Sequence, residues 1–163
     1  MTTLIENLAG VPSGSRLGQA LKTRAEILRL SEAAHDAVLL PRDPGGLSHA
    51  LRAALAARMC RHVGDDALTG HYDSYLDHSG DLDVSPLAHP GGTSGDPQHD
   101  AMARHADLLT LAPREATRAD IEALRATGLG DADIVRLSEL AAFVNYQLRV
   151  VAGIKLLKQV EAQ

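Results

Sequence analysis

The amino-acid sequence is poor in cysteine and in aromatic residues. Among its 163 residues there is one cysteine, Cys60, there is no tryptophan, and only 2% are aromatic. A single cysteine excludes an intramolecular disulfide and any zinc site built on two or more thiolates. So few aromatic rings leave little surface for stacking nucleic-acid bases. A free thiol fits a reducing compartment, and we therefore expect a cytoplasmic protein.

Positive charge and long apolar runs are also scarce. With 16 Lys and Arg against 21 Asp and Glu, the formal net charge is -5, which predicts no nucleic-acid partner. The longest apolar runs, residues 140–144 and 150–154, are far shorter than the ~20 residues that cross a bilayer, so we expect no membrane insertion. Residues 1–11 carry Glu6 and no basic region followed by an apolar stretch, so we expect no secretory signal.

The composition that remains is that of a globular helical protein. Apolar residues make up 45% and charged residues 23%, and the length predicts a single domain, 1–163. No run alternates with period two for long, so the predicted fold class is all-α, with about 6–7 helices. A Gly-, Pro- and Ser-rich stretch at about 78–95 is interpreted as a long loop that links an N-terminal half, about 1–77, to a C-terminal half, about 96–163.

Cap residues and helix breakers place the helices along the chain. A side-chain cap before an apolar periodic run predicts where a helix begins, and glycine or proline predicts where it ends. Residues 1–15 are interpreted as an arm or a short helix followed by a turn. The first predicted helix follows a capping box at Thr23 and Glu26 and ends at about Val38. The second extends from 49 to about 62 after Ser48, and the third begins after Asp65 or Asp66 and continues through Leu76. The last three extend from Pro97 to about 110, from Thr117 to Gly128, and from Asp131 to about 160.

The last predicted helix carries two apolar stripes on different faces. One contains Ile134, Leu137 and Val144, and the other contains Phe143 and Ile154. One neighbouring helix cannot cover both stripes. An unbroken helix of this span would be about 40 Å long, longer than a compact domain of this size. We therefore expect either a break near residues 137–140 or projection into a partner subunit.

Two segments carry a resemblance to a known family. Residues 48–76, an Ala-rich helix, a Gly-Asp turn and a helix bearing His71 and Tyr72, resemble the carboxymuconolactone decarboxylase and alkylhydroperoxidase-D superfamily. Residues 138–153 resemble the C-terminal helix of its peroxidase-related members, and the likeness covers roughly residues 20–160. The resemblance implies an alkylhydroperoxidase-D-like helical bundle, antioxidant peroxidase or decarboxylase-like lactone chemistry, and homo-oligomers from dimer to hexamer. We expect no cofactor.

The residues of the family's redox centre are largely replaced. Peroxidase members carry Cys-x-x-Cys-x-x-x-His at a helix start, where the helix N-terminus lowers a thiol pKa and a second cysteine resolves the sulfenic acid. A glutamate twelve positions before the first cysteine assists the proton relay. The resemblance places Gly64 and Ala67 at the two cysteines, His71 at the histidine and Arg52 at the glutamate. The dithiol reaction cannot run at such a site.

Cys60 and His71 are the candidate catalytic residues that remain. Arg58, Arg61 and His62 could favour a thiolate at Cys60, whereas its place near the end of a helix disfavours one and fits an inert packing residue. His71 can act as an acid or a base without thiols, or it can be a hydrogen-bonded structural residue.

The last helix supplies further candidates for a pocket near His71. Asn145, Tyr146 and Arg149 are polar among apolar neighbours, so together with Tyr72 they either line a cleft near His71 or hydrogen-bond between helices. An ion pair of Arg149 with Glu139 or Glu115 is the structural alternative. His35 with Asp36, and His99 with Asp100 and His105, are too few on any one helix face to predict a metal site.

These observations leave three hypotheses. The first is a peroxidase-related protein without a redox centre that binds, or transforms without thiols, a small hydrophobic or carbonyl compound near His71. The second is a peroxidase that uses Cys60 alone and an external thiol. The third is a non-catalytic partner of a true peroxidase subunit. A thiol-peroxidase role requires an accessible Cys60, and either enzymatic hypothesis requires a cavity beside its candidate residue.

Overall fold

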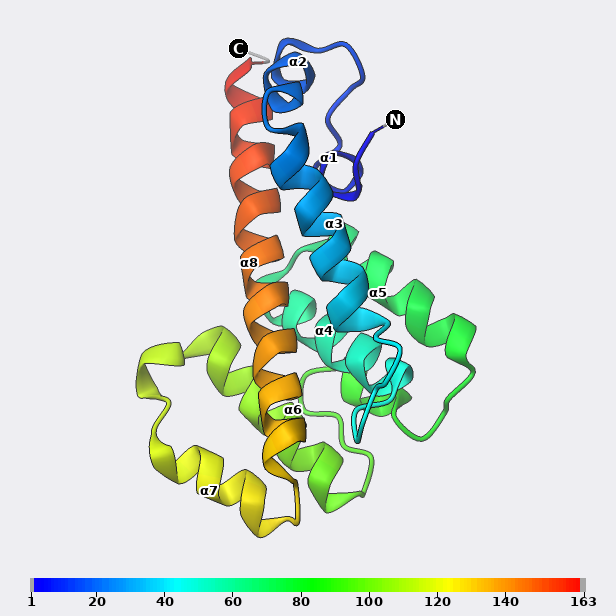
Figure 1. Ribbon diagram of the computed structural model, residues 1–163, viewed down its shortest axis with the longest axis vertical. Coiled ribbons are helices and arrows are strands. Elements are labelled where there is room, and N and C mark those ends of the chain that lie inside the picture. The colour runs from blue at the N-terminus through cyan, green and yellow to red at the C-terminus, as the bar shows by residue number, and fades with distance from the viewer. Residues whose placement is uncertain (1, 162–163) are drawn as a thin grey trace.

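The computed structural model describes residues 2–161, and all regular structure in this range is helical (Figure 1). The all-α prediction is therefore confirmed. The described range holds eight α-helices and two short 3-10 helices, more than predicted because α2 forms after the predicted arm, at residues 16–22, and the 3-10 helices form within predicted loops. Their bounds are α1 Leu4–Ala9, α2 Arg16–Lys22, α3 Ala25–Leu39, α4 His49–Val63, α5 Asp66–Ser79, η1 Ser85–Ala88, α6 Pro97–Leu111, η2 Pro113–Glu115, α7 Arg118–Ala126 and α8 Asp131–Glu161.

The Ala-rich helix α4 is the centre of the core. Every residue from Ala50 to Cys60 is buried, and α5, α6, α8 and η1 all contact this helix. Five of these eleven residues are alanine, whose small side chains allow the surrounding helices to approach closely. Because α4 is covered on all sides, its buried polar side chains must find hydrogen-bond partners within the protein.

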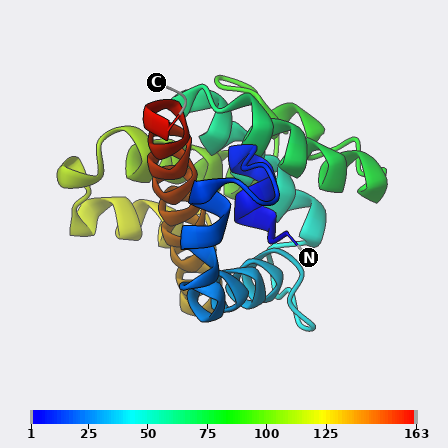
Figure 2. The same cartoon turned by 90° about the horizontal axis from the view of Figure 1, so that it is seen from above.

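Helix α8 is continuous and runs along most of the molecule (Figure 1). The predicted break near residues 137–140 does not occur, because different helices cover successive parts of α8: α6 and α7 contact it in its N-terminal half, and α1 and α2 near its C-terminal end. Seen from above, α3 and α8 lie side by side, with α1 next to them (Figure 2). By length and composition alone α8 could cross a membrane, but 44% of its most apolar window is buried inside the fold, as in the core helix of a globular protein.

Most of the predicted helix caps are present. The Oγ of Ser48 accepts from the backbone N–H of Leu51 at 3.1 Å, and Gly64 ends α4 at a φ of 79°. Asp65, Asp96 and Thr117 also cap as predicted. The capping box at Thr23 was wrong. Thr23 ends the unpredicted helix α2, and Glu26 instead binds Arg29.

The segment predicted as a long loop, residues 78–95, is folded onto α4. Helix α5 continues to Ser79, and η1 follows at Ser85–Ala88 with Leu87 fully buried. Nη1 of Arg58, on α4, donates to the carbonyl oxygens of Leu87, His89 and Gly92 at 3.2, 2.7 and 3.1 Å. The other side of the Arg58 guanidinium donates to both carboxylate oxygens of Asp107 on α6, at 2.6 and 2.7 Å. This segment is a packed part of the core rather than a free linker.

Candidate functional site

A pair of imidazoles joins α3 and α5. His71, on α5, has its Nε2 2.9 Å from Nε2 of His35, on α3. His35 is only 2% exposed, and its Nδ1 lies 3.0 Å from Oδ1 of Asp36, which is exposed to solvent. The three side chains therefore form a chain of hydrogen bonds from the surface to His71.

The aromatic side chains of the sequence gather around this pair. The ring centroids of Tyr72 and Tyr75 lie 5.1 and 5.2 Å from that of His71, and Phe143, on α8, lies 6.1 Å from His35. Tyr146 completes the group, 6.0 Å from Phe143. A sequence with few aromatic residues thus places all of them in one cluster, which we call the imidazole cluster together with His35 and His71.

The hydrogen-bond partners assign the tautomers of the two histidines. The Asp36 carboxylate only accepts, so Nδ1 of His35 carries a proton, and we assign the lone pair to its Nε2. The Nε2–H of His71 then donates to His35, and Nδ1 of His71 keeps its own lone pair. Burial, together with the neighbouring His35, lowers the pKa of His71 to about 4. His71 is therefore a neutral, oriented base at pH 7.

The lowered pKa of His71 predicts a pH-dependent stability. An unfolded histidine begins to bind a proton near pH 6.5, whereas folded His71 remains neutral until about pH 4. The stability contributed by neutral His71 is complete above pH 6.5 and is lost as the pH falls toward 4. We expect the free energy of unfolding to drop by about 2 kcal/mol in this window, after allowance for solvent screening of a half-buried ring. Urea unfolding of the wild type and His71→Gln at several pH values measures this drop. If the free energy of unfolding changes equally with pH in the two proteins, the prediction is contradicted.

The positions at which the family carries its two cysteines lie at a helix start, as the resemblance implies. Gly64 is the left-handed residue that ends α4, and Ala67 lies in the first turn of α5; both are exposed. Between them, Asp65 caps α5 and accepts from Nζ of Lys155 at 2.7 Å. This helix start therefore offers a carboxylate and a lysine, and no sulfur.

Arg52, at the family's glutamate position, holds backbone in place. Its guanidinium is 3% exposed and donates to the carbonyl oxygens of Leu47, Val38 and Pro44 at 2.9, 2.8 and 3.0 Å. Leu47 and Pro44 belong to the turn between α3 and α4, and Val38 lies in the last turn of α3. Arg52 is thereby committed to closing this turn, and its side chain is not directed toward His71.

Cys60 lies in the centre of the core. Its side chain is fully buried, and burial, with the Asp65 carboxylate as the next largest cause, raises the pKa of the thiol far above its usual value. A thiol held in this state is neither accessible to peroxide nor ionised. These features favour the packing role for Cys60.

The pocket candidates on α8 diverge. Tyr146 turns toward α3, where its hydroxyl lies 2.8 Å from the Ser31 hydroxyl, and it lines an apolar depression of about 330 Å³ with Phe143. Asn145 and Arg149 instead line a pocket of about 240 Å³ beside α6, and Nη1 of Arg149 donates to the Asn145 backbone carbonyl at 2.8 Å rather than to Glu139 or Glu115. Neither His71 nor Cys60 lines any of five well-formed pockets among residues 2–161.

Several residues of the imidazole cluster were not predicted as site residues. Tyr75 and Phe143 were assigned only to packing, and His35 was considered only as a metal ligand. The hydroxyl of Tyr72 donates to Oε1 of Gln147, a residue on α8 that is 1% exposed and was not considered. The helical spacing of His35 could have predicted its position, because it places His35 on the buried face of α3 formed by Leu28, Ser31 and Leu39. Within residues 2–161, no group of three or more His, Cys, Asp or Glu side chains is placed to hold a metal ion.

Comparison with known proteins identifies the fold. No protein-family model matches the sequence, and no curated protein matches it significantly. Among solved structures, an uncharacterized peroxidase-related protein from Silicibacter sp. TM1040 is similar with a TM-score of 0.69 and 20% identity, covering 88% of this chain and 86% of that chain. An uncharacterized peroxidase-related protein from Ralstonia eutropha JMP134, described as an alkylhydroperoxidase AhpD core, gives 0.53 and 23%, covering 90% and 85%.

The protein is thus a helical bundle with the same fold as these two proteins. More specifically, it has the alkylhydroperoxidase-D-like fold, and the resemblance predicted from residues 48–76 and 138–153 is confirmed at the level of the fold.

Proposed function

We propose that this protein uses the alkylhydroperoxidase-D-like fold without a dithiol centre, and that it binds, or transforms without thiols, a small apolar carbonyl compound at the imidazole cluster. The proposal rests on the observation that His71 is neutral and oriented by His35, while Gly64 and Ala67 provide no sulfur at the start of α5. The lone pair on Nδ1 of His71 can accept a proton or a hydrogen bond from a ligand, as a weak base because its pKa is low, and the surrounding rings suit an apolar body.

The proposal requires that a ligand can reach His71 from the surface. His71 is half-buried, and the apolar depression lined by Phe143 and Tyr146 borders the imidazole cluster. Phe143 contacts His35 through its ring edge, so a rotation of this single side chain would join the depression to the imidazole pair. A ligand would then enter between α3 and α8, at a depression that a second copy of the chain, proposed below, would border from its other side.

Titration of small carbonyl probes tests the proposal directly. Benzaldehyde, cyclohexanone and γ-valerolactone are added to the protein while the imidazole signals are followed by NMR. We expect saturable shifts of His71 and His35. The shifts of His35 should be lost in His71→Gln, and the shifts of both should be retained in His78→Gln, which changes an exposed histidine near the end of the same helix. If none of the probes moves the His71 signals, the proposal is wrong.

The thiol-peroxidase alternative is tested by the effect of Cys60 on the consumption of peroxide. Because the Cys60 thiol is buried and its pKa is raised, we expect hydrogen peroxide to be consumed in the presence of dithiothreitol at the same rate by wild type and Cys60→Ser. A rate that falls in Cys60→Ser would support the single-cysteine mechanism. Co-purification with a dithiol peroxidase would support the third hypothesis, a non-catalytic partner subunit.

We further propose a homo-oligomer in the cytoplasm, assembled through the α3–α8 face. Ile27 and Leu30 are each more than half exposed and border the apolar depression with Phe143 and Tyr146. Light scattering at micromolar concentration is expected to give at least a dimer, and Leu30→Glu a smaller species, because a charge would be buried at the contact. A monomeric wild type would contradict self-association.

A further inference from the structure

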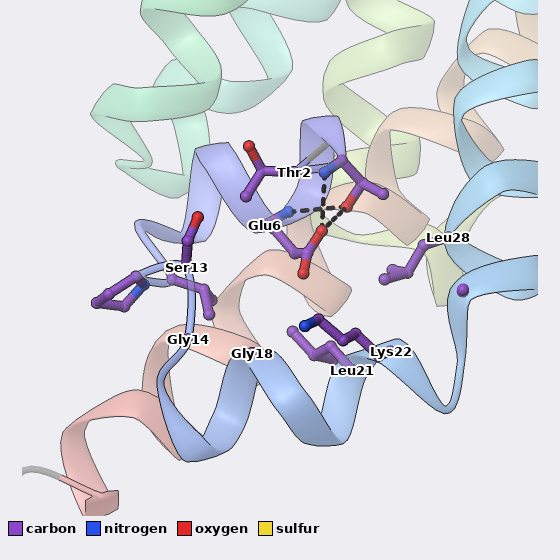
Figure 3. Close-up of a pocket in the computed structure, with 12 residues that line it drawn as sticks. Thr2, Glu6, Ser13, Gly14, Gly18, Leu21, Lys22 and Leu28 are labelled. Atoms are coloured by element: carbon purple, nitrogen blue, oxygen red, sulfur yellow. Dashed lines mark hydrogen bonds between the residues drawn. The ribbon is translucent and has the colours of Figure 1, made fainter.

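A second cavity lies away from the imidazole cluster, where α1, α2 and the start of α3 meet. Its volume is about 380 Å³, within the range of small-molecule sites, and Figure 3 shows its walls. The turn between α1 and α2 closes one side, at residues 11–14. This cavity has no part in the function proposed above.

One wall presents a buried carboxylate. Glu6 is only 9% exposed, and its Oε2 accepts from the backbone N–H and the hydroxyl of Thr3 at 2.7 and 2.8 Å. Among residues 2–161, no hydrogen-bond donor contacts its other oxygen, which points into the cavity (Figure 3). A carboxylate oxygen that faces a cavity and has no donor can accept from a cationic group, so this oxygen is suited to a ligand ammonium group.

The facing wall carries the opposite charge. Lys22, at the end of α2, lines the cavity across from Glu6, and the two side chains form no ion pair within residues 2–161 (Figure 3). The aliphatic side chains of Val11, Leu21 and Leu28 line the space beside them. One fixed negative charge, one mobile positive charge and an aliphatic wall together match a zwitterion that has an apolar side chain.

We propose that this cavity binds an aliphatic α-amino acid. The ligand ammonium donates to the free oxygen of Glu6, its carboxylate pairs with the ammonium of Lys22, and its side chain packs on Val11, Leu21 and Leu28. No bond is made or broken. The role is that of a binding site that fixes α1 against α2 and α3.

Calorimetric titration with L-leucine and two truncated analogues tests the proposal. Isopentylamine lacks the carboxylate, and isovalerate lacks the ammonium. We expect saturable binding of L-leucine and at least a tenfold weaker affinity for each analogue, the loss of about 1.4 kcal/mol expected for one charge contact. Equal affinity for all three compounds, or no heat from L-leucine at about 10 mM, would overturn the proposal.

Single variants test which residue contacts the carboxylate and which contacts the ammonium group of the ligand. Lys22→Met is expected to weaken L-leucine and isovalerate about tenfold and to leave isopentylamine unchanged. Arg24→Met is the matched control, because it removes an exposed cation two residues further on that does not line the cavity. Glu6→Gln should weaken L-leucine and isopentylamine, and its thermal unfolding shows whether the α1 capping box survives. Lys22 is exposed, so Lys22→Met tests the proposal even if Glu6→Gln does not fold. Equal effects of Lys22→Met and Arg24→Met would overturn it.

Discussion

Replacement of Arg58 by methionine is expected to lower the free energy of unfolding by about 3–5 kcal/mol. The guanidinium is 4% exposed and makes five hydrogen bonds, three to backbone carbonyls of residues 87–92 and two to Asp107. Methionine occupies a similar volume but donates nothing. It therefore leaves three acceptors and a half-buried carboxylate without their main partner.

Urea unfolding followed by circular dichroism measures this effect. Arg29→Met is the control, because its ion pair with Glu26 is exposed on both sides and is expected to contribute little to stability. Arg58→Lys should fall between the two, since it retains the charge but not the planar fork that contacts α6 and η1 at once. A loss below about 1 kcal/mol for Arg58→Met would show that residues 85–92 are held by other contacts.

Gly92→Ala is expected to destabilise the protein by about 3 kcal/mol. A Cβ at this position would lie 1.9 Å from the carbonyl oxygen of Pro86 and 2.8 Å from its carbonyl carbon. Both atoms are backbone, so no side-chain rotation can relieve the contact. The turn in which the Gly92 N–H donates to the carbonyl of His89, at 2.9 Å, would have to open.

A glycine elsewhere provides the control. Gly70, inside α5, has no neighbour within 4 Å of an added Cβ, and Gly70→Ala should stabilise the helix by about 0.5–1 kcal/mol. Gly92→Ala and Arg58→Met act on the same contact, so their combination should cost less than the sum of the two single changes. Additive losses would show that the turn and the arginine act independently.

Local chemistry in the sequence was sufficient to predict most helix boundaries. Ser48, Gly64 and Asp96 act on atoms within four residues, and such contacts do not depend on the rest of the fold. Thr23 failed for the opposite reason. Helix α2 precedes it and packs on α8, so a tertiary contact decided that Thr23 ends one helix rather than begins the next.

The candidate site was only partly predictable. His71 followed from the family resemblance, but His35 lies 36 residues away, and their hydrogen bond exists only because α3 and α5 pack around the same core. The packing of residues 78–95 could not be predicted from the sequence for a similar reason. Its composition is that of a loop, whereas the group that orders it is Arg58, which precedes it in the chain.

The end of α8 also determines when the N-terminal helices can fold. Nζ of Lys158 donates to the backbone carbonyls of Ala9 and Gly10, at 2.9 and 3.2 Å, and a carboxylate oxygen of Glu161 accepts from the N–H of Leu17, 144 positions earlier in the chain, at 3.1 Å. A ribosome makes these partners at opposite ends of this stretch of chain. The first two helices therefore lack the surface on which they dock until the residues of α8 have been synthesised.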